Sequence, residues 1–233
     1  MEDARHPSVL HVWDVAGVAC TLAKWTNKVY GANTNVYAMK KDDPFGHLTD
    51  GESYVETGKR FSTLVLQNIR NFDIVHIHGV DDFVYRVKKY YPRKPVVLHY
   101  HGTDIRGRWN IRQGHWRYAD VILVSTLDLL EGAPKEVVYL PNPVDTDLFY
   151  PNPNCSEVAP NSALTFKYGA VDLAEKLAEK HGLVLCVHRR NKRFLEMPQL
   201  LRKFGWYIDV QRNNVGVLLC RREGSGSLTG LEA

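Results

Sequence analysis

Short apolar runs alternate along this chain with longer segments whose apolar residues recur at helical spacing. The first run, 8–16, reads as a strand, and the segment 17–31 follows it with Val18, Leu22 and Trp25 on one helix face. The same alternation predicts further strands at 35–40, 73–79, 95–102 and 120–126 and further helices at 52–72, 81–92 and 110–119.

Several of these predicted strands are apolar on both faces. Such strands are covered by helices on both sides, which is typical of a doubly wound parallel α/β sheet. In these sheets ligands bind at the carboxyl ends of the strands. Three of the predicted ends carry "DVAG" (14–17), "HGVDD" (78–82) and "HGTD" (101–104), so we expect a functional site at this edge.

A stretch rich in Pro, Asn and Asp, 137–162, interrupts the alternation and is typical of an interdomain linker. We therefore expect a Rossmann-like domain over 1–145, a linker over 146–162, and a partial second Rossmann-like domain over 163–233. In the second domain, strands are predicted at 163–168, 183–189, 206–212 and 215–220, with helices at 170–182 and 196–205.

The composition and charge of the chain exclude few classes of function. The 233 residues carry a formal net charge of +4, too little to indicate nucleic acid but compatible with an anionic small molecule or a membrane surface. The N-terminus has no apolar signal region, and no apolar run approaches the ~20 residues that span a bilayer. Four widely separated cysteines favour reduced thiols, so we expect a cytoplasmic protein with no transmembrane segment.

Two predicted strands end in paired histidines. Strand alternation places His76 and His78 on one face of their strand, and His99 and His101 on one face of theirs. Four imidazoles could bind a metal, but no carboxylate or cysteine stands at ligand spacing. We therefore predict no metal site here.

A sugar-binding or acid–base role is the interpretation that we favour for His101. The adjacent Gly102 would let a ligand approach the backbone closely. Asp104 could orient the imidazole or bind a hydroxyl group, and a helix N-cap is the alternative role for its carboxylate.

Gly17 lies at a predicted strand-to-helix turn. Free amides and the helix dipole favour an anion at such a turn, although a single glycine is equally consistent with a tight turn only. Two stretches, 85–94 and 106–118, mix Arg and Lys with Tyr and Trp. They suit anionic lipid headgroups, nucleic acid, or a solvated helix face that buries its aromatic residues. We favour the solvated face and expect no nucleic-acid partner.

Five segments, taken in order, resemble the retaining nucleotide-sugar glycosyltransferases with the two-domain GT-B fold. They are "VAGVACTLAKW", "FDIVHIHG", "PVVLHYHGTD", "ADVILVST" and "YLPNPVDTDLF". In the last of them Asn142, Val144, Asp145 and Phe149 match the family's pattern at the domain linker. The order and spacing of the five segments, over about 150 residues, carry the resemblance.

The resemblance implies two facing Rossmann-like domains, of which the first binds the acceptor and the second the nucleotide sugar. His101 would lie near the transferred sugar, and Gly17 would approach the donor phosphates or the acceptor. The reaction would move a sugar from a nucleotide-diphosphate sugar to a hydroxyl acceptor with retention, with no cofactor. The acceptor could be lipid-linked, with the protein peripheral to the inner membrane face.

The second half departs from the family's pattern. In the family, several cations bind the donor diphosphate, and this chain offers a counterpart for only one of them, Lys167. Glu232 resembles the family's glutamate that binds the ribose. The family continues beyond the position of Ala233, so we expect a C-terminally truncated relative with impaired donor binding. The alternatives are a non-catalytic sugar- or acceptor-binding module and a GT-B-like nucleotide-sugar epimerase.

Overall fold

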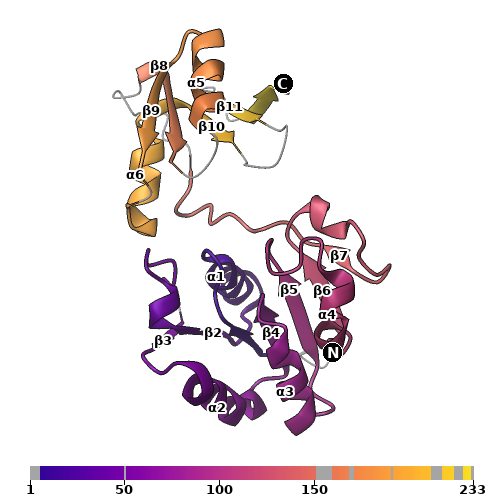
Figure 1. Cartoon of the computed structure of the whole chain (residues 1–233). Helices are drawn as coiled ribbons and strands as arrows, with labels where there is room; N and C mark the ends of the chain where they lie inside the picture. Colours follow the sequence, from indigo (N-terminus) through magenta and orange to yellow (C-terminus); the bar gives the residue numbers. More distant parts are fainter. Residues whose placement is uncertain are drawn as a thin grey trace, which may run out of the picture. The chain divides into compact units, whose positions relative to one another are not determined.

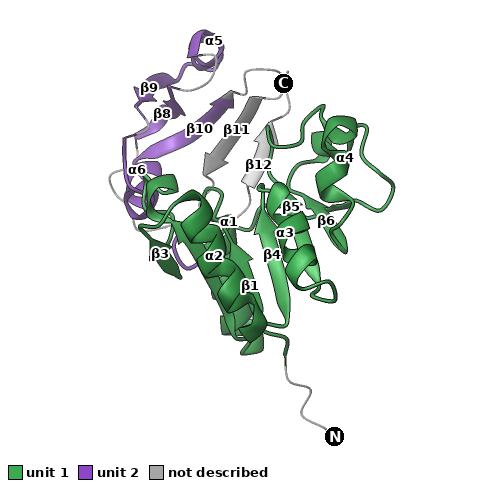
Figure 2. Cartoon of the chain, turned by 60° about the horizontal axis from the view of Figure 1, so that its bottom comes forward, with its two compact units in different colours: residues 1–144 green, residues 145–233 purple. Residues whose placement is uncertain are grey.

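The computed structural model divides the chain into two compact units, Met1–Val144 (unit 1) and Asp145–Ala233 (unit 2), and each is described by itself (Figure 2). The structure describes residues 6–49, 51–150, 159–167, 171–189, 191–210, 217–222 and 228–231.

Unit 1 is a seven-stranded parallel sheet with helices on both faces (Figure 1). The strand order is β3-β2-β1-β4-β5-β6-β7, so the order reverses between β1 and β4. The strands are β1 (Val9–Val12), β2 (Thr34–Met39), β3 (Glu52–Tyr54), β4 (Ile74–His78), β5 (Val96–Tyr100), β6 (Val121–Val124) and β7 (Val138–Tyr139). The helices are α1 (Val18–Tyr30), α2 (Gly58–Asn68), α3 (Asp82–Tyr90) and α4 (Trp109–Trp116), with short 3-10 turns η1 (Lys40–Asp42), η2 (Ile69–Asn71) and η3 (Leu127–Leu130). This confirms the predicted doubly wound α/β sheet.

The prediction of one helix over 52–72 was wrong at its start. Residues Glu52–Tyr54 form β3, which pairs with β2 so that Met39 lies opposite Tyr54. The ring of Tyr54 packs against those of Tyr37 and Phe61. Pairing with the edge of β2 is a tertiary interaction, and it overrides the local pattern for this short segment.

The two faces of the central strands differ in chemistry. On one face, alternate residues such as Leu10, Ile77 and Leu98 form the main core with apolar residues of α2 and α3. On the other face, the intervening positions of β1, β4 and β5 hold the buried histidines His11, His76, His78 and His99. The expectation that these strands are apolar on both faces was therefore wrong for the centre of the sheet. The second face also carries the smaller cluster between α1 and Val36.

Unit 2 contains a five-stranded sheet of order β12-β11-β10-β8-β9. The strands β8, β9 and β10 are parallel, whereas β11 and β12 are antiparallel. The elements are β8 (Ala159–Phe166), α5 (Val171–Lys180), β9 (Val184–His188), η4 (Phe194–Glu196), α6 (Met197–Leu201), β10 (Phe204–Val210), β11 (Val217–Arg222) and β12 (Leu228–Leu231). A core of Ala163, Ala174, Leu177 and Ile208 joins α5 to the sheet. The first strand begins at Ala159, inside the stretch 146–162 that we expected to be a linker.

The helices of both units are short. Among the described residues, none combines the length and the apolar character that a bilayer-spanning helix needs.

Candidate functional site

A cavity of about 460 Å³ lies at the carboxyl ends of β1, β4 and β5 in unit 1. Residues 13–16, 78–80 and 101–104 line it, together with Asp42. The strand order reverses between β1 and β4, and open α/β sheets bind ligands at such a switch point. Its volume is within the range of small-molecule sites, roughly 300–1,000 Å³.

The loop after β1 has an unusual backbone. Trp13 and Ala16 both have positive φ, at 65° and 54°, and Gly17 follows at 83°. A positive φ is uncommon for residues other than glycine and persists only where the surroundings impose it. Here the ring of Trp13 packs edge-on against Phe61 and Phe83, which anchors the loop in the core.

This loop places Asp14 in the wall of the cavity. Its Oδ1 accepts a hydrogen bond of 2.8 Å from the amide of Ala19, in the first turn of α1. Burial raises the pKa of Asp14, and the neighbouring Ala19 and Cys20 partly offset that shift. The ionised carboxylate can accept hydrogen bonds from substrate hydroxyls.

Gly17 is the N-cap residue of α1, in the left-handed conformation that the turn requires. It is not among the residues that line the cavity. Because the carboxylate of Asp14 already accepts from the Ala19 amide, an anion approaching this helix terminus would meet a negative group. The anion-binding role of Gly17 thus remains a prediction, and this arrangement does not favour it.

Asp104 fixes the turn that carries His101. One of its oxygens accepts from the amide of His101 at 2.9 Å, and the other accepts from that of Gly102 at 2.7 Å. The nearby Gly79, at φ 73°, allows this approach, because a Cβ atom there would lie 3.1 Å from the Asp104 carboxylate. The carboxylate therefore orients the backbone of His101, with Gly102 beside it in the cavity wall.

The ring of His101 belongs to a chain of hydrogen-bonded side chains. Its Nδ1 lies 3.3 Å from Oδ1 of Asn142, and its Nε2 lies 3.1 Å from Nδ1 of His78. Nε2 of His78 lies 2.9 Å from Nδ1 of His11. A neutral imidazole carries one N–H group. Because the Asn142 oxygen can only accept, Nδ1 of His101 carries the proton of that ring, and its Nε2 accepts from Nδ1 of His78. In the same way, Nε2 of His78 accepts from Nδ1 of His11.

Burial keeps these imidazoles neutral. It lowers the pKa of His11 and of His99 to about 3, assisted by repulsion from neighbouring histidines. The pKa values of His76 and His78 are lowered in the same way, well below their ordinary value. The pKa of His101 is lowered by burial too, and the charge of Asp104 opposes that shift.

The structure brings together three of the six predicted site residues, His101, Gly102 and Asp104. Lys167 belongs to unit 2, where it is exposed directly after β8. Glu232 lies outside the described residues.

The sequence analysis missed two residues of this region. Asp14 was not assigned a role, although its place directly after a predicted strand was an available signal. His11 has no distinguishing local pattern, and only the pairing of β1 with β4 brings it beside His76.

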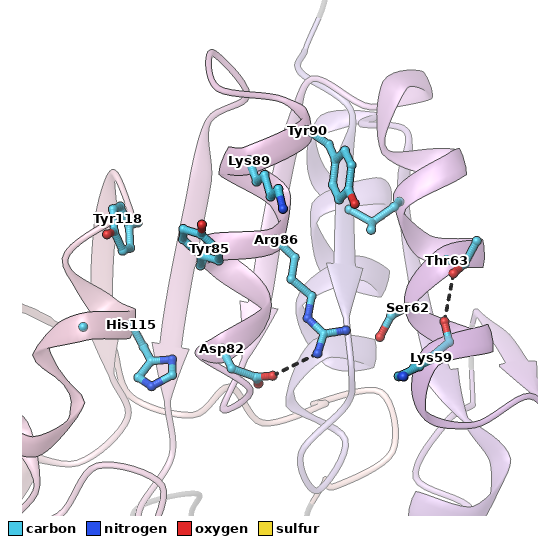
Figure 3. Close-up of a pocket in the computed structure, with 12 residues that line it drawn as sticks. Lys59, Ser62, Thr63, Asp82, Tyr85, Arg86, Lys89, Tyr90, His115 and Tyr118 are labelled. Atoms are coloured by element: carbon cyan, nitrogen blue, oxygen red, sulfur yellow. Dashed lines mark hydrogen bonds and ion pairs between the residues drawn. The ribbon is translucent and has the colours of Figure 1, made fainter.

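A second hollow, the basic groove, is lined by residues of α2, α3 and α4 and by Tyr118 (Figure 3). It has a volume of about 740 Å³, and the cations Lys59, Arg86 and Lys89 line it. Asp82, the carboxylate of the groove, lies 3.8 Å from Arg86. The tyrosines of the groove are Tyr85, Tyr90 and Tyr118. Residues of both stretches that mix basic and aromatic side chains, 85–94 and 106–118, therefore line a groove.

Comparison with known proteins gives little further information. No family model and no curated protein matches the chain. A solved structure of UDP-N-acetylglucosamine 2-epimerase from Rickettsia bellii resembles it with a TM-score of 0.45 and 10% identity, covering 89% of this chain and 70% of that one. A similarity of this size carries no argument about function.

Proposed function

We propose that this protein is a GT-B-type glycosyltransferase that moves a sugar from a nucleotide-diphosphate sugar to a hydroxyl acceptor with retention. The observation that carries the proposal is the cavity at the carboxyl ends of β1, β4 and β5, with carboxyl and imidazole groups in its wall. Such groups form hydrogen bonds with the several hydroxyls of a sugar. The order of the five sequence segments that resemble the family supports the same assignment.

In this proposal Asp14 and His101 contact the sugar, and Asp104 holds the turn that carries His101. Asp14 is suited to bind a hydroxyl because carboxylate oxygens accept hydrogen bonds from O–H groups. Lys167 contributes a cation toward the diphosphate, on which negative charge develops as the bond to the sugar breaks. No cofactor takes part in the proposed reaction.

The experiment is an incubation of the full chain with a panel of nucleotide-diphosphate sugars and hydroxyl acceptors, followed by mass spectrometry and NMR. We expect a glycosylated acceptor whose anomeric configuration equals that of the donor. Epimerised free nucleotide sugar would instead indicate an epimerase. Binding of a sugar or an acceptor without turnover would indicate a binding module. Either outcome would replace the proposal.

The variant Asp14→Ala tests the assignment of the cavity. Loss of a hydrogen bond to a charged group costs about 1.5–3 kcal/mol, so we expect kcat/KM for transfer to fall roughly tenfold to a hundredfold. The control is Glu131→Ala, which removes an exposed carboxylate from a turn outside the cavity and should leave kcat/KM unchanged. Equal rates in the two variants would place the sugar elsewhere.

A lipid-linked acceptor at a membrane surface is part of the proposal, and the basic groove supports it. Each cation near an anionic surface contributes about 1 kcal/mol. Replacing Lys59 and Lys89 together by Ala should therefore weaken binding to phosphatidylglycerol vesicles by about 2 kcal/mol, or roughly thirtyfold. Co-sedimentation measures this effect.

The matched control for the groove is Lys24→Ala with Lys28→Ala, which removes the same charge from α1 on the other face of the sheet. An equal loss of vesicle binding in both double variants would show a response to net charge only. Binding to neutral phosphatidylcholine vesicles as strong as to anionic ones would exclude the electrostatic mechanism.

A further inference from the structure

Three histidines at the carboxyl ends of β4 and β5, His78, His99 and His101, are arranged as a set of ligands. One ring nitrogen of each can be chosen so that all three atoms lie within 4.8 Å of one another. We propose that these three imidazoles bind one divalent transition-metal ion of the zinc class, with the remaining coordination position open toward the cavity.

The spacing of the nitrogens suits tetrahedral zinc. Nδ1 of His78 and Nε2 of His101 are 3.1 Å apart. Zinc–nitrogen bonds of about 2.0–2.1 Å in a tetrahedron separate two ligand nitrogens by roughly 3.3 Å. An ion could therefore bind between these two atoms with only a small adjustment of the rings.

The rings are also in the protonation state that a metal requires. Imidazole binds a metal through the lone pair of its neutral form. Burial lowers the pKa values of His78, His99 and His101, so their rings are neutral at physiological pH. Binding would not have to displace a proton from a charged ring.

Each proposed ligand has an outer partner that can orient it. Asn142 accepts from Nδ1 of His101 and so directs the lone pair of Nε2 toward His78. His11 lies at Nε2 of His78, and binding of an ion at Nδ1 would move the proton of His78 to that nitrogen. The proton of His11 would then move to its own Nε2, so that its Nδ1 accepts from His78. The backbone of Leu140 interacts with His99 closely enough to raise its pKa. Outer partners of this kind are a regular feature of metal-binding histidines.

His99 provides an independent reason to expect a ligand. It is fully buried, and within the described part of the chain neither of its ring nitrogens makes a hydrogen bond of normal geometry. Leaving a buried polar group unpaired costs about 1–3 kcal/mol, so such groups in native proteins call for an explanation. A metal ion bound to one ring nitrogen of His99 would pair that nitrogen and reduce this cost.

A second set, His11, His76 and His78, also meets the distance condition, but all three residues are buried. In the proposed set, His78 and His101 line the cavity, which gives an ion a path from solvent. His78 belongs to both sets, so the two cannot both be filled through it. We therefore assign the ion to the set at the cavity.

This proposal replaces the sequence-based expectation that no metal binds. That expectation rested on the lack of a carboxylate or cysteine partner, whereas three imidazoles with an open fourth position are a known zinc arrangement. The proposal does not depend on the proposed glycosyl transfer, and its test measures binding only.

The test is calorimetric titration of the full chain, without a histidine tag, with zinc chloride, alongside elemental analysis. We expect one equivalent of zinc to bind. His101→Ala and His99→Leu should abolish this binding. Asn142→Ala, an exposed outer partner, should weaken it roughly tenfold to a hundredfold. The control His76→Leu removes a ligand of the deeper set and none of the proposed set, and should leave zinc binding intact.

Circular dichroism and thermal unfolding would establish that each variant is folded. If the variants at the buried positions His99 and His76 do not fold, His101→Ala and Asn142→Ala still test zinc binding. Both positions lie nearer the surface, so these two variants should fold. Unchanged zinc affinity in these two variants would overturn the proposal. So would failure of the wild-type chain to bind, or loss of binding in His76→Leu with retention in His99→Leu.

Discussion

Lowering the pH from 7 to 5 should destabilise unit 1 of the metal-free protein by at least about 4 kcal/mol. Burial lowers the pKa of His11 and of His99 from 6.5 to about 3. Between these values the unfolded chain binds protons that the folded chain excludes, so stability is fully present above pH 6.5 and is lost as the pH falls. At 1.36 kcal/mol per pH unit, each of the two histidines contributes about 2 kcal/mol to the loss by pH 5.

The measurement is urea unfolding at a series of pH values with a chelator present. Tryptophan fluorescence reports mainly on unit 1, which holds Trp13, Trp25, Trp109 and Trp116 of the five tryptophans. His76 and His78 shift in the same direction and should steepen the response.

The variant His11→Leu separates the histidines from other acid-sensitive groups. It removes one of the excluded protons, so its loss of stability between pH 7 and pH 5 should be about 2 kcal/mol smaller than that of the wild type. If both proteins respond equally to acid, the buried histidines are not the cause.

Replacing Asp81 by Ala should lower the free energy of unfolding by about 3 kcal/mol. Asp81 is 1% exposed, and its carboxylate accepts hydrogen bonds from the hydroxyl of Tyr100 at 2.7 Å and from Arg112 at 2.8 Å. Removing one partner of a buried ion pair costs about 3–5 kcal/mol. We take the lower end because the side chain of Arg112 is 27% exposed and water can solvate part of the guanidinium.

The next residue supplies a matched control. Asp82 is half-exposed and forms a surface pair with Arg86 at 3.8 Å, so Asp82→Ala should cost less than about 1 kcal/mol. Tyr100→Phe removes one hydrogen bond but leaves the ion pair, and should cost about 1 kcal/mol. Urea unfolding measures all three variants, and similar losses for Asp81→Ala and Asp82→Ala would contradict the role of the buried network.

The amino-acid pattern by itself determined the fold class and the edge of the sheet where a cavity would lie. Alternating apolar runs and amphipathic segments are a local property, and they predicted the parallel sheet that the structure contains. The polar residues after 73–79 and 95–102 likewise marked the strand ends that meet at the cavity. Local pattern failed at Glu52–Tyr54, where pairing with β2 decides the structure.

Only the tertiary structure decided which residues meet. His11 and Asp14 are more than 60 residues from His76 in sequence, and the strand order places β1 between β2 and β4. That order brings His11 against His76 in register and closes the cavity around Asp14. The sequence shows which face of its own strand a histidine occupies, because alternation is local. It does not show which strands are neighbours, because strand order is set by the packing of the whole sheet and its helices.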